Sequence, residues 1–195
     1  CYISVGGVKL MAEVIKVIGK NAFVQVFEST RGMRVGDEAE FEGHMLEVTL
    51  GPGMLSRNYD GLQNDLDKME GVFLRRGEYT FPLDNDKLWD FKPLAKVGDK
   101  VAAGGWLGEV DENFQPHKIM VPFTFKGEYT VKSLKEAGQY TIGEVIAVLT
   151  DETGKDVEVT MIQRWPVKRA ITCYKEKPRP YKLLETGVRT IDTVN

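Results

Sequence analysis

The sequence is poor in the residues that build redox and metal sites. Its 195 residues include two cysteines and two histidines, at Cys1, Cys173, His44 and His117. Two thiols are too few for a disulfide framework or a cysteine-based zinc site, which favours a reducing compartment. Two imidazoles argue against a multi-histidine metal site.

Long apolar runs are also missing. No stretch approaches the ~20 apolar residues that span a bilayer, and the start lacks the layout of a signal peptide. Apolar residues make up 42% and charged residues 28%, the balance of a soluble domain. Because the chain begins with Cys1 and stops within IDTVN, we expect it to be a piece of a longer protein.

The glycine-rich stretch LGPGMLS (50–56) invites comparison with a phosphate-binding loop. A Walker loop needs a Lys and a Ser or Thr after its glycines, and this stretch has no such Lys. Pro52 also removes one of the backbone N–H donors that would cradle a phosphate. The dinucleotide fingerprint fails because Ser56 stands where its third glycine belongs. We therefore interpret GPG as a turn.

Other catalytic motifs are absent as well. There is no nucleophile elbow and no H-E-x-x-H sequence. Asp84, Asp86 and Asp90 loosely imitate a calcium loop but lack its glycine and terminal Glu, so we interpret them as exposed turn carboxylates. We predict no catalytic, cofactor-binding or metal-binding residue in this chain, with both histidines hydrogen-bonded in turns. The tryptophans are expected to fill the core (Trp89, Trp106, Trp165).

Positive charge is concentrated near the end of the chain. Residues 164–189 carry eight Lys or Arg and two Glu, a local charge of +6 in a chain of net charge −3. This pattern fits either a nucleic-acid arm, with Trp165 and Tyr174 stacking on bases, or a solvated connector or subunit contact. The Pro-interrupted composition favours the connector. Nucleic-acid affinity would fall steeply with salt.

Alternation of apolar and polar residues predicts a mainly β protein. Residues 12–18 and 22–28 read as a hairpin around GKN, and HMLEVTL (44–50) as a further strand. Residues 1–50 are therefore predicted to form a small antiparallel barrel or curled meander that is short of residues at its front. Further strands are expected around the turns of 96–110, at 117–122, 127–134 and 141–150, and in a closing hairpin that Pro166 ends.

One segment shows a helical period instead. Apolar residues at steps of three and four predict a short helix with Ser56 as its N-cap (Leu55, Tyr59, Leu62, Leu66, Met69). Gly61 would weaken it by about 1 kcal/mol. A single helical turn is also expected in KSLKEAG (132–138).

Three stretches in a fixed order carry a family resemblance. EVTLGPGMLSRNYDGLQNDL (47–66) resembles the segment after the N-terminal barrel of the catalytic A subunit of V-type and archaeal A-type rotary ATPases. FKPLAKVGDKVAAGGWLGEV with HKIMVP resembles the inserted bulge of that subunit. YTIGEVIAV, MIQRWPVKR and ETGVRTIDTVN are similar to the run into its nucleotide-binding domain. Asn64 and Asp65 depart from the family, which often has Arg-Pro there.

The resemblance implies four parts. They are an N-terminal barrel lacking its first strand (1–51), a turn and short helix (52–71), a barrel-sandwich-like bulge (72–165) and a basic linker to an absent nucleotide-binding domain (166–195). The fragment would be inactive, holding an alternating hexamer with the B subunit and presenting the bulge to peripheral-stalk subunits. The full-length protein would bind Mg-ATP, beyond Asn195, and couple its hydrolysis or synthesis to H⁺ or Na⁺ transport. It would lie in the cytoplasm, peripheral to the membrane, without binding nucleic acid. Arg189 and Asp192 would set the linker against the next domain.

A lipoyl- or biotinyl-like carrier is the alternative. Residues 97–110 match the V-G-D-x-V-x-x-G-x-x-L-x-E-V pattern that such carrier domains share. Their cofactor is attached to a Lys at a hairpin tip, flanked by Met or preceded by Asp. Lys118, in HKIMVP, has neither flank.

Mass spectrometry of the expressed chain separates these two classes. We expect Lys118 to be unmodified, because it lacks the flanking residues of a carrier lysine. A peptide containing Lys118 with the added mass of a lipoyl or biotinyl group would establish the carrier instead.

Overall fold

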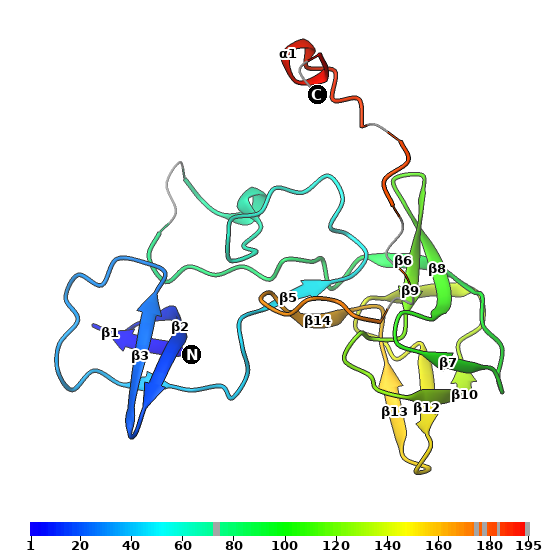
Figure 1. Ribbon diagram of the computed structural model, residues 1–195, viewed down its shortest axis with the longest axis horizontal. Coiled ribbons are helices and arrows are strands. Elements are labelled where there is room, and N and C mark those ends of the chain that lie inside the picture. Colours follow the sequence, from blue (N-terminus) through cyan, green and yellow to red (C-terminus); the bar gives the residue numbers. More distant parts are fainter. Residues whose placement is uncertain (72–74, 174–175, 177–178, 183, 194–195) are drawn as a thin grey trace.

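The computed structural model describes residues 1–71, 75–173, 176, 179–182 and 184–193. It contains a β sheet at the N-terminal end, a two-layer β sandwich, and a polar connector between them (Figure 1). Part of the basic stretch lies outside the described residues, namely Tyr174, Lys175 and Lys177.

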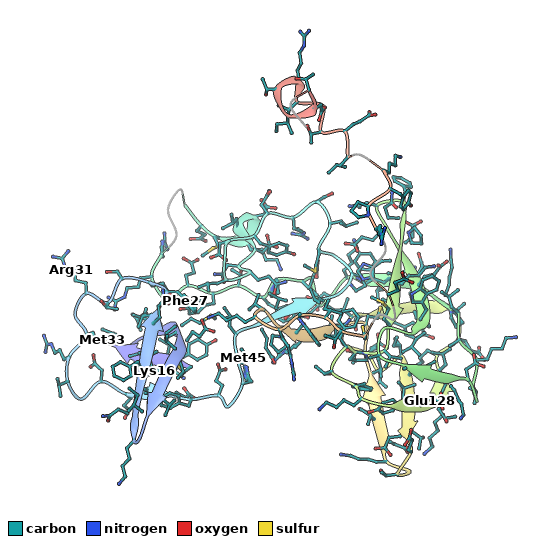
Figure 2. All side chains as sticks on the ribbon, in the orientation of Figure 1. Lys16, Phe27, Arg31, Met33, Met45 and Glu128 are labelled. Carbon is teal, nitrogen blue, oxygen red and sulfur yellow. The ribbon has the colours of Figure 1, made fainter. Side chains whose placement is uncertain are left out.

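The N-terminal sheet has four antiparallel strands in the order β3-β2-β1-β4. These are β1 (Tyr2–Val5), β2 (Val8–Ile18), β3 (Asn21–Val26) and β4 (Ala39–Glu40). The predicted 12–18/22–28 hairpin is confirmed as β2 and β3, with a register shift between Val14 and Lys16. The sheet is open, with β3 and β4 at its edges, so residues 1–43 form a curled antiparallel meander in this structure. Arg31 and Met33 lie on its outer loop (Figure 2).

The strand predicted in HMLEVTL is found as β5 (Glu47–Leu50), but it does not join the N-terminal sheet. It pairs with β14 (Gln163–Pro166), more than a hundred residues later, with Leu50 opposite Gln163 and Glu47 opposite Pro166. Val167 N extends this ladder by donating to Leu46 O at 2.9 Å. The pair lies between the N-terminal sheet and the sandwich (Figure 1).

The sandwich consists of two four-stranded sheets. One has the order β11-β6-β8-β9 and the other β13-β12-β10-β7. Their bounds are β6 (Leu88–Pro93), β7 (Lys100–Ala102), β8 (Trp106–Glu112), β9 (Gln115–Met120), β10 (Glu128–Leu134), β11 (Gly138–Thr141), β12 (Ala147–Asp151) and β13 (Asp156–Val159). All pairings are antiparallel, and the strands expected from alternation in this region are confirmed, although residues 142–144 form a turn and β12 begins only at Ala147. The predicted closing hairpin before Pro166 is wrong, because β13 pairs with β12 whereas β14 pairs with β5.

Two apolar clusters fill the sandwich. The first surrounds Phe91 and Trp89, and the second surrounds Leu107 and Leu149. Trp89 and Trp165 are buried as predicted, whereas Trp106 is 59% exposed, so its predicted core position is wrong. Lys118 Nζ lies 5.0 Å from the Trp106 ring centroid, a cation–π contact at the surface.

The predicted helix over 55–69 is wrong. Only a three-residue 3₁₀ helix, η1 (Leu66–Lys68), is present in this segment, and Ser56 has a left-handed φ of 62° instead of capping a helix. The reason is competition from polar side chains: Asp60 Oδ1 accepts from Leu62 N at 2.9 Å and from Asn64 N at 2.8 Å. Such local bonds replace the helical ladder. The turn of helix expected in KSLKEAG is also wrong, since residues 132–134 belong to β10. A short helix, α1 (Arg189–Asp192), lies near the end of the described chain.

Gly108 allows strands β8 and β6 to approach closely, and replacing it with Ala should destabilise the sandwich. A Cβ there would lie 2.2 Å from Phe91 Cε2 and 2.8 Å from Lys92 O. Since Phe91 is fully packed, relief requires core movement, and we expect a loss of about 1–3 kcal/mol in the free energy of unfolding. Urea unfolding followed by circular dichroism measures it.

Gly143→Ala is the matched control, because a Cβ at that turn position meets nothing within 4 Å. Equal stability of the two variants would contradict the close β8–β6 approach.

Candidate functional site

The GPG turn binds a carboxylate, but the carboxylate belongs to the chain itself. Glu112, at the end of β8, places Oε1 within 2.7 Å of Gly53 N and 2.9 Å of Leu55 N. Both amides donate to this single oxygen. The turn therefore has the oxyanion-binding geometry that glycine-rich turns offer, and its site is occupied by Glu112.

The second oxygen of Glu112 is also used. Oε2 lies 2.7 Å from Nδ1 of His117 on the neighbouring strand β9. The Glu112 side chain is 3% exposed, so its charge is compensated by three hydrogen-bond partners within the protein. His117 thus lies in a strand and not in the predicted turn, and its role is to hold this carboxylate.

The GPG turn also packs on the first core cluster. A Cβ at Gly53 would lie 3.5 Å from the Trp89 ring, and one at Gly51 would lie 2.7 Å from Ile162. Gly53 adopts φ 105°, which side chains rarely adopt. Gly51 is therefore needed for close approach to the sandwich and Gly53 for its backbone conformation, and no phosphate is required to explain them.

The polar connector (residues 52–69) completes this junction. The Gln63 side chain bonds to the backbone of β5 as a neighbouring strand would. Its amide accepts from Thr49 N and donates to Thr49 O, both at 2.7 Å. Asp65 is fully buried and accepts from Arg57 Nη1 at 3.1 Å. Asn64 accepts from Thr80 N at 3.0 Å. The two residues that depart from the resembled family, Asn64 and Asp65, are thus both buried and bonded.

A second contact ties the N-terminal sheet to residues 77–79. The Tyr79 hydroxyl donates to Glu28 Oε1 and accepts from Met11 N at 2.6 Å, while Gly77 N donates to Glu28 Oε2 at 2.7 Å. Burial and the bond to Glu28 raise the pKa of Tyr79, so the phenol stays protonated. Glu28 and Tyr79 line part of a cavity of about 570 Å³.

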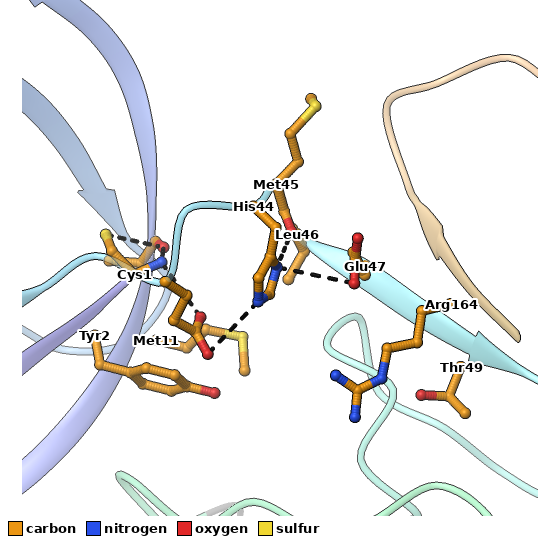
Figure 3. A pocket seen from close by; sticks show the side chains of 11 residues that line it. Cys1, Tyr2, Met11, His44, Met45, Leu46, Glu47, Thr49 and Arg164 are labelled. Atoms are coloured by element: carbon orange, nitrogen blue, oxygen red, sulfur yellow. Dashed lines mark hydrogen bonds and ion pairs between the residues drawn. The ribbon is translucent and has the colours of Figure 1, made fainter. Parts of the chain in front are cut away.

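A smaller cavity of about 170 Å³ lies between the N-terminal sheet and β5 (Figure 3). His44 stands in it, 3.8 Å from both Glu42 Oε1 and Glu47 Oε2, with Nδ1 2.9 Å from Met45 O. Arg164 and Thr49 lie on its other side. At these distances and with 44% exposure of the His44 side chain, its contacts with the two carboxylates are weak.

The other candidate residues that the sequence suggested do not form a site. Asp84 accepts from Asp86 N at 3.1 Å in an exposed turn. Within the described ranges, no group of three His, Cys, Asp or Glu side chains is placed to hold a metal ion. Asp192 accepts from Thr186 and Gly187, and these bonds, that of the Thr186 backbone foremost, lower its pKa.

Lys118 is not at a hairpin tip, as a carrier lysine would be. It lies within β9, with the tip at residues 113–114, and its ammonium pairs with Glu109. That hydrogen bond lowers the pKa of Glu109. The carrier alternative therefore gains no support from its position.

Two family models match this arrangement of β units. The model described as "ATP synthase alpha/beta family, beta-barrel domain" matches residues 1–43. The model described as "ATPsynthase alpha/beta subunit barrel-sandwich domain" matches residues 80–168. The chain belongs to the ATP synthase alpha/beta family.

Relatives within that family include V-type chains. The chain is 47% identical over 195 residues to the V-type ATP synthase alpha chain of Treponema denticola, covering 98% of this chain and 33% of the relative. It is 46% identical to that of Borrelia garinii subsp. bavariensis, over 98% of this chain and 34% of the relative. For Protochlamydia amoebophila the identity is 43% over 194 residues, 98% of this chain and 32% of the relative. The chain spans about a third of the length of these relatives.

Removing the Glu112 carboxylate should destabilise the junction. In Glu112→Ala the amides of Gly53 and Leu55 and the ring of His117 lose their partner, and we expect a loss of about 3 kcal/mol in the free energy of unfolding. Glu112→Gln keeps one oxygen acceptor and should lose less. Chemical denaturation gives both values.

Glu158→Ala, at an exposed position of β13, serves as the control and should change stability by less than about 0.5 kcal/mol. If Glu112→Ala were as stable as this control, Glu112 would not hold the turn.

Proposed function

We propose that this chain is the non-catalytic N-terminal part of the catalytic A subunit of a V/A-type rotary ATPase. The rest of the longer protein would bind Mg-ATP and couple its hydrolysis or synthesis to H⁺ or Na⁺ transport. The identity of 43–47% to V-type ATP synthase alpha chains across 98% of this chain supports the proposal. The GPG turn, which is suited to anion binding, is filled by Glu112, and this supports a scaffold role for this part.

The N-terminal sheet would hold alternating A and B subunits in a hexamer. The observation that carries this role is the apolar surface of the β2–β3 hairpin. Val17 is 64% exposed, Ile18 51% and Phe23 55%. β3 is an edge strand, so the backbone N–H and C=O groups on its outer side pair with no other strand of this sheet. Exposed apolar side chains on a hairpin whose outer strand is a sheet edge are typical of a subunit interface.

The sandwich would be the bulge that meets peripheral-stalk subunits. We propose the boundaries 1–51, 52–71, 72–165 and 166–195 for barrel, connector, bulge and linker. Support comes from the separate apolar clusters of the sandwich, which give it a core of its own. In the described part of the chain no helix is long and apolar enough to cross a membrane. We place the protein in the cytoplasm, peripheral to the membrane.

The β5–β14 pair offers a direct test of this division. Because Leu50 and Gln163 are opposite each other, replacing residues 51–162 of the full-length protein with Asn-Gly would turn β5 and β14 into a two-residue hairpin. We expect this variant to form the hexamer with the B subunit and to hydrolyse ATP, while coupled ion transport is lost. Hexamer formation, hydrolysis and ion uptake into vesicles are measured in parallel.

A variant with only the β12–β13 turn shortened is the control for altered surface loops. Full coupling in the excised variant would contradict the stalk role of the sandwich. Failure of a correctly folded N-terminal sheet to join the B subunit would contradict its role in the hexamer.

A further inference from the structure

A short segment, residues 75–79, lies against the N-terminal sheet, and we call it the strap. Gly77 N donates to Glu28 Oε2 at 2.7 Å, just beyond the end of β3. The Tyr79 hydroxyl accepts from Met11 N in β2 at 2.6 Å and donates to Glu28 Oε1. A single side chain of the strap therefore bonds to both β2 and the end of the β3 segment.

The strap also fits the sheet closely in shape. A Cβ at Gly77 would lie 2.2 Å from Val8 Cγ1 and 3.2 Å from Lys9 O, and Gly77 has a left-handed φ of 71°. A larger residue at this position would displace the strap from β2. The Tyr79 ring packs edge-on against that of Tyr2, with the ring centroids 6.2 Å apart. Steric fit and hydrogen bonding thus favour the same arrangement.

Most of the polar contacts that hold the sheet come from the strap. Arg76 Nη1 donates to Arg31 O, in the loop after β3, at 2.8 Å. In the described part of the chain, the only hydrogen bond from residues 1–40 to residues beyond 46 that does not involve the strap joins Lys168 to Glu13. The covalent link to β5, residues 41–46, is mostly exposed. A link of this kind does not by itself fix the orientation of the sheet.

Apolar packing contributes little to that orientation. Two cavities lie between the sheet and the rest of the chain. One, of about 570 Å³, is lined by Phe27 on its sheet side, and the other, of about 170 Å³, by Tyr2 and Met11 (Figure 3). Closely packed interiors leave few voids larger than a water molecule. Because polar, loosely packed interfaces allow relative motion of the units they join, the directional bonds of the strap are the contacts that select one orientation.

We propose that the strap sets the orientation of the N-terminal sheet and that Tyr79 is a positioning residue for subunit assembly. This inference rests on the function proposed above, in which the β2–β3 hairpin meets the B subunit. Tyr79 bonds near the start of β2, whereas the exposed Val17 and Ile18 are the last residues of that strand. Its effect on assembly is therefore indirect. Releasing the sheet lowers the fraction of molecules in the binding orientation and weakens the apparent affinity in proportion.

Tyr79→Phe tests the strap, because it keeps the aromatic ring and removes the hydroxyl that bonds Met11 and Glu28. Tyr59→Phe is the matched control. It removes a hydroxyl that donates to Pro82 O at 2.7 Å, a bond between two residues outside the N-terminal sheet. Both variants thus lose one partly buried phenol hydroxyl, but only the first loses it from the strap.

The orientation is measured in the full-length protein by single-molecule energy transfer between fluorophores at Lys20, in the β2–β3 turn, and Glu152, in the β12–β13 turn. We expect one narrow distribution of transfer efficiency for the wild type and for Tyr59→Phe, and a clearly wider one for Tyr79→Phe. Gly77→Ala, which acts through steric displacement, should widen it as well. The apparent Kd for the purified B subunit should rise about fivefold for Tyr79→Phe and less than about twofold for Tyr59→Phe.

The outcomes separate the strap from the proposed function. Equal distributions for Tyr79→Phe and Tyr59→Phe, or an unchanged distribution for a folded Gly77→Ala, would overturn the strap and leave the proposed function standing. A wider distribution with unchanged affinity for the B subunit would overturn the role of Tyr79 in assembly. Failure of the folded wild-type protein to bind the B subunit would instead overturn the proposed function.

Discussion

The connector region, which contains only the short helix η1 and no strand, has to satisfy most of its backbone hydrogen bonds in other ways, and this constraint organises the whole junction. Side chains supply the partners. Glu112 accepts from the amides of Gly53 and Leu55, and the Gln63 side chain bonds to both the N–H and the C=O of Thr49. Buried backbone groups left without partners would cost more than most single contacts contribute. Because Glu112 belongs to the sandwich and Thr49 to β5, the same bonds that satisfy the connector also fix the sandwich against the rest of the chain.

The β5–β14 pair explains how a large β module fits within this arrangement. Its four residue pairs join segments more than a hundred residues apart, yet the entropic cost of closing a loop grows only with the logarithm of its length. The folded sandwich also brings the two ends near each other, which lowers that cost further. A hairpin position is therefore a site where a whole domain can be accommodated while the strands on either side keep their register.

The sequence was most informative where one local period dominates. Alternation located β2, β3 and most sandwich strands, since a strand with one buried face repeats every two residues. The spacing of Leu55, Tyr59 and Leu62 wrongly indicated a helix, because apolar residues at steps of three and four also occur in a loop folded over a core. The Asp60-Gly61 and Asn64-Asp65 pairs were the contrary signal. The pairing of β5 with β14 and the capture of Glu112 by the GPG turn depend on distant residues, which no local pattern encodes.

The two β units differ in how much apolar surface each buries by itself. The sandwich encloses two clusters, whereas the N-terminal sheet fully buries only Val5, Leu10 and Ala12 among its described apolar side chains. Burial contributes roughly 25 cal/mol per Å², so this sheet gains little stability alone. It is tied to residues 77–79 through Glu28 and Tyr79, and Lys168 Nζ donates to Glu13 Oε2 at 2.8 Å. These polar ties fix its position without covering the exposed β2–β3 hairpin. A neighbouring subunit that covered this hairpin would therefore bury apolar surface and stabilise the sheet. The part of the chain with the smallest core of its own is thus the part best suited to assembly.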